Sequence, residues 1–225
     1  MKIVATTRTR NEARNIERFI ESYWWVDEVL IADGGSSDPT IRNALRYEGV
    51  KVRNFEERVQ GANGHWRNPH GRHINFIIDW AKQERADWMI FDDADCVPTR
   101  SLQENGRDLI ENAQAETVYA NRMYVYKNEG YFPLLSSSGN GLWAWKVTSP
   151  IRASEANPWQ HTMVDNSVGR LDLQSPYALL HYTWPTDKQI NEKLRFYRES
   201  GEQEAAAHPL TFAGDISPLP KWAVW

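Results

Sequence analysis

The chain is 225 residues long, with 41% hydrophobic and 25% charged residues, as is ordinary for a soluble globular protein. Its net charge of −4 argues against a general nucleic-acid-binding protein, and its single cysteine, Cys96, excludes an internal disulfide bond. The N-terminus lacks the apolar core of a signal peptide, and no apolar run approaches the roughly 20 residues that span a bilayer. We therefore expect a cytoplasmic protein without a transmembrane segment, either free or peripheral to a membrane.

Strand and helix patterns alternate along the first half of the chain. Apolar runs predict strands over residues 2–6, 26–32, 51–55 and 88–91, and apolar residues at helical spacing predict helices over residues 12–23, 73–85 and 101–113. Asp38 followed by Pro39 predicts a further helix, with Asp38 as its N-cap. This alternation predicts an α/β fold with a mostly parallel central sheet flanked by helices.

The second half is less regular. Strand-like stretches cover residues 117–127, 139–147 and 177–180, and the last of them ends at His181 before a predicted loop over residues 182–185. Residues 149–174 have no clear period, whereas residues 188–201 have a helical pattern. No repeat or linker divides the chain, so we expect residues 1–225 to form a single domain.

Polar residues of the first half concentrate in three loops that follow predicted strands, over residues 7–11, 33–38 and 92–98. In open α/β sheets, ligands bind beyond the carboxyl ends of the strands, so these loops predict one shared crevice. Asp93 and Asp95 are two residues apart, and on an extended chain both carboxylates can reach one cation. Such oxygens suit Mg²⁺ or Mn²⁺ carrying a substrate phosphate, although an acidic loop that only caps a helix has the same pattern.

The loop over residues 33–38 has features of a ligand-binding turn. Gly34 and Gly35 allow positive φ and a close approach of the backbone to a ligand. Asp33, at the end of its strand, could accept a hydrogen bond from a base N–H or a ribose hydroxyl. A dinucleotide site is disfavoured because no Gly-x-Gly-x-x-Gly follows the first strand, and no Gly-Lys-Ser/Thr phosphate loop is present.

Three ordered segments resemble family 2 glycosyltransferases of the GT-A fold. They are Thr9-Arg10-Asn11-Glu12-Ala13-Arg14-Asn15-Ile16, Asp33-Gly34-Gly35-Ser36-Ser37-Asp38-Pro39-Thr40 and Phe91-Asp92-Asp93-Ala94-Asp95. The resemblance implies a Rossmann-like half that binds a nucleotide sugar, over residues 1–98, and a more irregular acceptor half over residues 99–225. It further implies a nucleotide-diphosphate-sugar donor, commonly a UDP-sugar, with Mn²⁺ or Mg²⁺ and a hydroxyl acceptor.

The resemblance also assigns roles to individual residues. The donor pocket would be formed by Thr7, Arg8, Arg10, Glu12, Asp33, Arg72 and Asp93, with Asp33 on the base and Arg72 near the diphosphate. The cation would be held by Asp93, Asp95 and His181, with Asp95 as the main ligand, and a structural histidine is the alternative for His181. The cation would act as a Lewis acid on the leaving nucleoside diphosphate. Lys188 and Lys193 would add positive charge or lie on a solvated helix face.

An inverting transfer, which the resemblance favours, needs a general base for the acceptor hydroxyl. In the family this carboxylate often belongs to a Glu-Asp pair in the second half, and no such pair occurs here. Asp165 is the first candidate and Glu155 the second. A retaining enzyme would not need this base, so the stereochemical outcome stays open.

Two other functions and several acceptors compete with this interpretation. A non-catalytic nucleotide- or sugar-binding module of the same fold is one alternative, and a haloacid-dehalogenase-type phosphatase with Asp93 as nucleophile and Asp95 as acid/base is a weaker one. The acceptor would be a glycan, a lipid-linked glycan or, less favoured, a modified nucleic acid. The residues that could contact its phosphates are Arg58, His65, Arg67, His70, Arg72 and His73 around Trp66, and an ordinary flexible surface loop over the donor site is the alternative for this segment. The tail with Trp222 and Trp225 could touch a membrane interface or pack back on the domain, and the oligomeric state is left open.

Overall fold

The computed structural model describes residues 1–60, 64, 66–126, 130–131, 141–156, 162–184, 186, 188, 191, 195, 217–221 and 223. His65, Lys193, Trp222, Trp225 and most of the predicted helix over residues 188–201 lie outside these residues. No helix among the described residues is long and apolar enough to cross a membrane.

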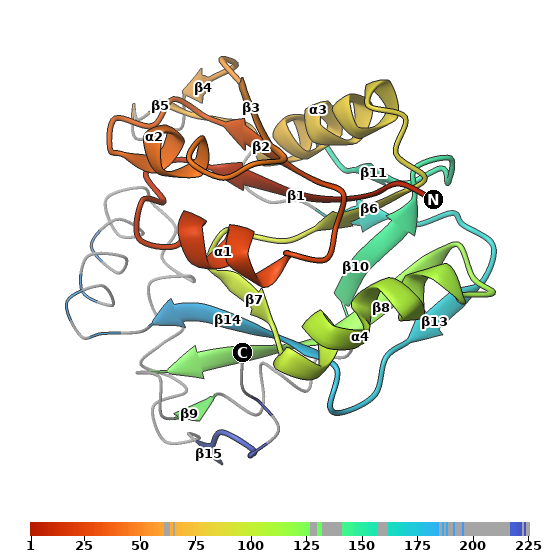
Figure 1. The fold of residues 1–225 in the computed structure, drawn as a ribbon. Helices are drawn as coiled ribbons and strands as arrows, with labels where there is room; N and C mark the ends of the chain where they lie inside the picture. Colours follow the sequence, from red (N-terminus) through yellow and green to blue (C-terminus); the bar gives the residue numbers. More distant parts are fainter. Residues whose placement is uncertain are drawn as a thin grey trace.

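Figure 1 shows the helices and strands whose bounds the described residues define. In chain order they are β1 (Ile3–Thr9), α1 (Ile16–Ser22), β2 (Glu28–Asp33), α2 (Thr40–Ala44), β3 (Val50–Asn54), β4 (Val59–Gln60), β5 (Trp66–Arg67), α3 (His70–Gln83), β6 (Trp88–Phe91), β7 (Cys96–Pro98), α4 (Arg100–Glu111), β8 (Thr117–Tyr126), β9 (Gly130–Tyr131), β10 (Gly141–Lys146), β11 (Arg152–Ala153), β12 (Met163–Val164), β13 (Arg170–Asp172), β14 (Ala178–Trp184) and β15 (Ser217–Pro218).

A mixed sheet with a parallel centre organises the molecule, which confirms the predicted α/β architecture. Strands β3, β2, β1 and β6 are parallel neighbours, and β10 then pairs antiparallel with both β6 and β8. Beyond them β14 runs parallel to β8 and antiparallel to β7. The sheet therefore continues from the regular first half of the chain into the second half.

Helices cover both faces of the parallel strands because side chains alternate along each strand. Ile3 and Ala5 of β1 pack in one apolar cluster with residues of α1 and α4, whereas Val4 packs in another with residues of α3. Trp143 and Trp145 of β10 divide between the same two clusters. A third, smaller cluster joins β7, β8 and β14.

The register of the parallel strands brings their carboxyl ends together. Thr9 at the end of β1 lies opposite Asp33 at the end of β2, and Thr6 lies opposite Phe91 at the end of β6. The loops after β1, β2 and β6 therefore share one edge of the sheet, where the sequence predicted a crevice.

Strand β14 differs from its prediction. It continues through residues 182–184, where a loop was expected, and His181 lies inside the strand rather than at its end. The extension has a structural reason: residues Leu179 to His181 pair with β7, and Ala178 to Trp184 pair with β8 across one irregularity. Residues 149–174 also form three short strands, β11, β12 and β13.

Candidate functional site

Hydrogen bonds join the loop after β1 to the loop after β2. Asn11 has a positive φ of 62°. Its side-chain Oδ1 accepts from the Ser37 N–H in the second loop at 2.8 Å. The Asn11 N–H in turn donates to Ser36 Oγ at 2.8 Å. Asp38 accepts from the Ala13 N–H at 3.1 Å and from the Thr40 N–H at 3.0 Å. Helix α2 begins at Thr40 with Pro39 as its N-cap, so the predicted N-cap role of Asp38 is wrong by one residue, and its carboxylate joins the two loops instead.

Asp33 is buried at the end of β2, and both of its oxygens are used within the loop. Oδ1 accepts from Thr9 Oγ1 at 3.0 Å and from Ser36 Oγ at 2.5 Å. Oδ2 accepts from the N–H groups of Gly35 at 2.9 Å and Ser36 at 2.7 Å. This carboxylate shapes the loop that faces the crevice, and its assignment to a nucleotide base stays a prediction.

The other residues assigned to the donor pocket lie around these two loops. The Thr7 side chain is buried, and its hydroxyl donates to the Arg8 carbonyl at 3.3 Å. Arg10 is exposed and donates to the Trp66 carbonyl of β5 at 3.3 Å. Glu12 begins the approach to α1, where its carboxylate accepts from Asn15 Nδ2 at 2.8 Å.

Arg72 belongs to the first turn of α3 and forms ion pairs with two carboxylates. One is that of Glu57, and the other is that of Glu155, at 3.7 Å. Glu155 also accepts a hydrogen bond from Asn75 Nδ2 at 2.7 Å. The structure thus brings the second candidate base beside α3, together with a residue predicted to approach the diphosphate.

The loop after β6 presents its first exposed carboxylate to β1. Asp93 Oδ1 lies 3.4 Å from both Nε and Nη2 of Arg8, and the two side chains are 27% and 17% exposed. A guanidinium at this position places a positive charge at the carboxyl ends of β1 and β6, where the sequence predicts a crevice. The structure thus joins two residues that were predicted separately for the donor pocket, and Asp93 as a metal ligand stays a prediction.

Asp92, which no sequence argument singled out, is fully buried. Its Oδ1 accepts from Arg122 Nη2 at 2.8 Å, and its Oδ2 accepts from the Tyr23 hydroxyl at 3.3 Å. Burial raises the pKa of the Asp92 carboxyl, against the lowering effect of Arg122. The sequence contains one signal for its partner: Arg122 is the only charged residue within residues 117–126, so a buried strand there would need a carboxylate to pair with it.

Asp95, Cys96 and His181 form the cluster that could hold a cation. Each offers one ligand atom, and these atoms lie within 4.8 Å of one another. His181 Nε2 is 3.1 Å from Asp95 Oδ1, with the side chains 13% and 19% exposed. The cluster is a product of strand pairing, because His181 lies opposite Cys96 in register and the Tyr182 N–H donates to the Asp95 carbonyl at 2.9 Å.

The chemistry of this cluster fits a divalent cation such as Mn²⁺. Carboxylate and imidazole are ligands that this ion accepts. The ring nitrogen that faces Asp95 is Nε2, whereas the other nitrogen, Nδ1, is buried without a hydrogen-bond partner among the described residues. Burial raises the pKa of the Cys96 thiol well above its usual value, which disfavours the thiolate form that binds metals. The fit therefore rests on Asp95 and His181.

Asp165, the first candidate base, makes its contacts elsewhere. It accepts from the Tyr119 hydroxyl at 2.6 Å and from the Ser167 N–H at 2.9 Å. Tyr119 and Arg122 are three residues apart on β8, so their side chains leave opposite faces of that strand. Burial raises the pKa of Asp165, but the hydrogen bonds from Ser167 and Tyr119 prevail and lower it, which weakens the carboxylate as a base. The hydrogen bonds and ion pairs of Asp165 and Glu155 do not reach Asp95 or His181 among the described residues.

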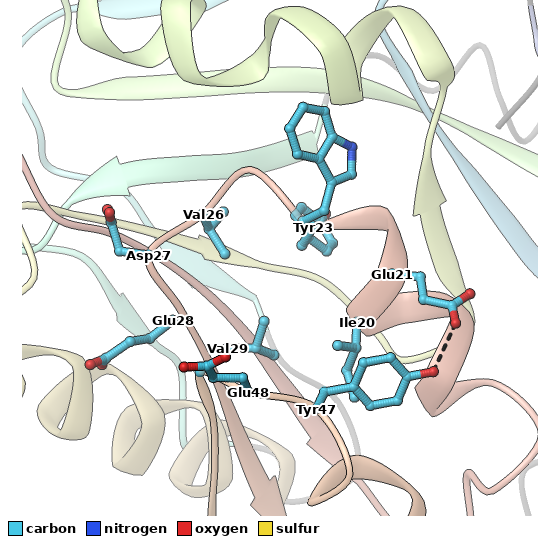
Figure 2. Close-up of a pocket in the computed structure, with 11 residues that line it drawn as sticks. Ile20, Glu21, Tyr23, Val26, Asp27, Glu28, Val29, Tyr47 and Glu48 are labelled. Atoms are coloured by element: carbon cyan, nitrogen blue, oxygen red, sulfur yellow. Dashed lines mark hydrogen bonds between the residues drawn. The ribbon is translucent and has the colours of Figure 1, made fainter.

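A pocket of about 310 Å³ lies beside the start of β2 (Figure 2). It is lined by the end of α1, the start of β2 and the turn before β3, and Tyr47 donates to Glu21 across it at 2.8 Å. Glu28 of the lining and Asp33 of the crevice are at opposite ends of β2, roughly 16 Å apart along the strand. The candidate site is therefore assigned, on the chemistry of its side chains, to the loops after β1, β2 and β6. The pocket lies at the other end of β2 and is not part of that site.

Comparisons with known proteins agree with this geometry. The structure of residues 1–349 of TarS from S. aureus superposes with a TM-score of 0.57 at 15% identity, over 93% of this chain and 71% of that one. The same protein in complex with UDP-GlcNAc gives a TM-score of 0.54 at 16% identity, over 93% of this chain and 72% of that one. Glucosyl-3-phosphoglycerate synthase from Mycobacterium tuberculosis, in complex with Mn²⁺ and UDP-glucose, gives 0.50 at 17% identity, over 89% and 79% of the two chains.

These similarities establish the GT-A fold. No curated protein sequence gives a significant match to the chain. A model of the family described as Glycosyl transferase family 2 matches residues 7–172, which is more than half of the sequence. The chain is therefore a member of glycosyl transferase family 2 with the GT-A fold, as its three sequence segments predicted.

Proposed function

We propose that this chain transfers a sugar from a nucleotide-diphosphate sugar, a UDP-sugar in the first place, to a hydroxyl acceptor with the help of a divalent cation. The observation that carries the proposal is the meeting of the Asp95–His181 pair and the Arg8–Asp93 pair at the carboxyl ends of β1 and β6. It is supported by the TarS complex with UDP-GlcNAc and the synthase complex with Mn²⁺ and UDP-glucose. Family membership argues against the phosphatase alternative for Asp93 and Asp95.

The proposed roles follow from charge. Asp95 and His181 would hold Mn²⁺ or Mg²⁺, which when bound neutralises the negative charge that develops on the leaving diphosphate. Arg8 would bind a diphosphate oxygen, since its guanidinium already lies beside Asp93 at the crevice. The loop held by Asp33 would receive the nucleoside. Residues 1–98 would form most of the donor half, and residues 99–225 the acceptor half together with His181.

The general base is the least supported role. We retain Asp165 and Glu155 as candidates, although the hydrogen bonds of Asp165 lower its pKa and Glu155 pairs with Arg72. An inverting transfer requires a general base, and these two carboxylates are the candidates that we propose. Loss of transfer with intact donor binding in Asp165→Asn or Glu155→Gln would identify the base.

Thermal unfolding tests the donor site directly. UDP, GDP, CDP and TDP are each added with Mn²⁺ or with EDTA to the wild type, to Asp95→Asn, and to Asp108→Asn as a matched control on the exposed face of α4. A ligand at 100 times its dissociation constant stabilises the fold by about 2.7 kcal/mol. For a domain of this size the expected rise in Tm is about 5–11 °C. We expect it for UDP with Mn²⁺, in the wild type and Asp108→Asn only.

A transfer assay then separates an enzyme from a binding module. UDP release from UDP-glucose and UDP-GlcNAc is measured with a panel of glycan and lipid-linked acceptors. Release that needs Mn²⁺ and is lost in Asp95→Asn supports the proposed activity. Binding of UDP without release on any acceptor would favour the non-catalytic module, and a Tm that no nucleotide changes would refute the donor site.

A further inference from the structure

The buried carboxylate of Asp92 holds the beginning of the turn that carries Asp93, Asp95 and Cys96. Asp92 is 0% exposed, and its Oδ1 accepts from the N–H of Asp93 at 3.2 Å. The turn is then closed by the Cys96 N–H, which donates to the Asp93 carbonyl at 2.9 Å. A side chain that water cannot reach therefore fixes the backbone from which the Asp95 carboxylate projects.

Two partners from distant parts of the chain neutralise and orient Asp92. Arg122 of β8 donates from Nη2 at 2.8 Å, and the Tyr23 hydroxyl at the end of α1 donates at 3.3 Å. Tyr23 is itself held by Trp143 of β10, whose Nε1–H donates to the tyrosine hydroxyl at 3.3 Å. The ion pair thus connects β6 to β8, two strands that are not neighbours because β10 pairs with both.

The same strand β8 determines where His181 lies. Leu179 of β14 pairs with Arg122, and His181 pairs with Tyr124 two residues further on, with ring centres 5.0 Å apart. One end of the Asp92–Arg122 pair is therefore joined to the turn with Asp95, and the other end to the strand that positions His181. Asp92 is buried and the Arg122 side chain is 26% exposed. Ion pairs that are largely removed from water contribute little net stability compared with apolar residues of similar volume, which points to a role other than stability for this one.

We propose that Asp92 and Arg122 are positioning residues, which hold the Asp95 carboxylate and the His181 imidazole at the separation that a divalent cation requires. The inference rests on the proposed function, because it concerns the cation site of the same reaction. It adds two residues that would contact neither cation nor donor, and it predicts that their loss acts first on cation affinity.

The test compares Mn²⁺ affinity in matched variants. Asp92→Asn removes the negative charge, and the double variant Asp92→Asn/Arg122→Met removes the pair without leaving the Arg122 guanidinium without its carboxylate. Asp27→Asn is the control, because Asp27 accepts from Arg107 Nη2 at the same 2.8 Å and from the Ile3 N–H at 2.7 Å, at the other end of the strands. Free Mn²⁺ is followed by electron paramagnetic resonance in titrations with and without UDP, and folding is checked by circular dichroism.

We expect the affinity for Mn²⁺ to fall by about 10–100-fold in both Asp92 variants, as for other residues that orient metal ligands, and to be unchanged in Asp27→Asn. UDP affinity at saturating Mn²⁺ should stay near the wild-type value. Folded Asp92 variants with wild-type Mn²⁺ affinity would overturn the positioning role alone. Unfolding of both Asp92 variants while Asp27→Asn folds would also overturn it, since the pair would then serve the fold. A wild type that binds neither Mn²⁺ nor UDP would overturn the proposed function itself.

Discussion

His73 of α3 is an ionisable side chain that burial keeps uncharged. Its ring is 3% exposed, stacks on Phe55 with centres 4.3 Å apart, and contacts the Ala32 carbonyl through Nε2 at 3.0 Å. Since a carbonyl only accepts, Nε2 carries the proton of the neutral ring. Burial, and then the nearby charge of Arg8, lower the pKa of His73 to about 4. The sequence makes this histidine a candidate for contact with acceptor phosphates, but in the fold it is a neutral core residue.

The lowered pKa of His73 predicts acid sensitivity of the fold. Its contribution to stability is complete above pH 6.5, the ordinary histidine value, and is lost as the pH falls toward 4, because the unfolded state binds the extra proton first. Between pH 7 and pH 5 the free energy of unfolding should fall by about 2 kcal/mol from this group. In His73→Gln that part of the decrease should disappear, as measured by urea unfolding at both pH values.

The control for this prediction is His70→Gln, which places the same side chain on the first turn of α3 at a half-buried position. It should keep the wild-type difference between pH 7 and pH 5. An equal decrease in His73→Gln and the wild type would show that His73 does not cause the acid sensitivity.

At the scale of elements, α3 joins the two halves of the molecule through a close backbone contact. A Cβ built at Gly71 would lie 2.0 Å from the Ser154 carbonyl oxygen and 3.3 Å from Glu155 Cα. No flexible side chain can move aside there, so the glycine lets the segment that carries Glu155 approach the helix. The first turn of α3, with Arg72, is thereby packed on a segment of the second half.

Gly71→Ala should therefore destabilise the protein, although alanine is the better helix former. Overpacking costs about 1–3 kcal/mol, and the gain in helix propensity offsets at most about 1 kcal/mol. We expect Tm to fall by roughly 2–8 °C in thermal unfolding. Gly141→Ala is the matched control, since nothing lies within 4 Å of its added Cβ, and its effect should stay within about 0.5 kcal/mol. A Tm of Gly71→Ala equal to that of the control would contradict the close contact.

The elements of the first half could be predicted because their signals are local. The run over residues 88–91 is apolar and buried on both faces, and the strand has the predicted bounds. The helix predicted over residues 12–23 is confirmed only as Ile16–Ser22, because the residues before it bond to the loop after β2. The pairing of Asp92 with Arg122 could not be predicted, since it depends on where β8 lies in the sheet and on burial, neither of which has a local signal.

The whole molecule builds its candidate site from segments that are far apart in the chain. Asp95 and His181 are brought together by the pairing of β14 with β7, and Arg8 and Asp93 by the pairing of β1 with β6. The sequence motifs and the family resemblance point to these residues, but the distances between their side chains follow from the register of the sheet. Because the residues of the site come from several separate segments of the chain, a ligand bound there should stabilise all of these segments at once.

Hydrogen exchange can measure this coupling directly. With UDP and Mn²⁺ together, we expect slower amide exchange in peptides covering residues 7–15, 33–40, 92–97 and 178–182, because local opening of any one of them would break contacts with the ligand. Mn²⁺ alone should protect only residues 92–97 and 178–182, which contain Asp95 and His181. Peptides over residues 20–29 and 47–49, around the pocket of Figure 2, should exchange at unchanged rates and serve as the internal control. Asp95→Asn should abolish the effect of Mn²⁺. Protection confined to the pocket peptides would place the nucleotide at the amino ends of the strands and contradict the proposed donor site. Protection of all four segments would show that the register of the sheet assembles the donor site.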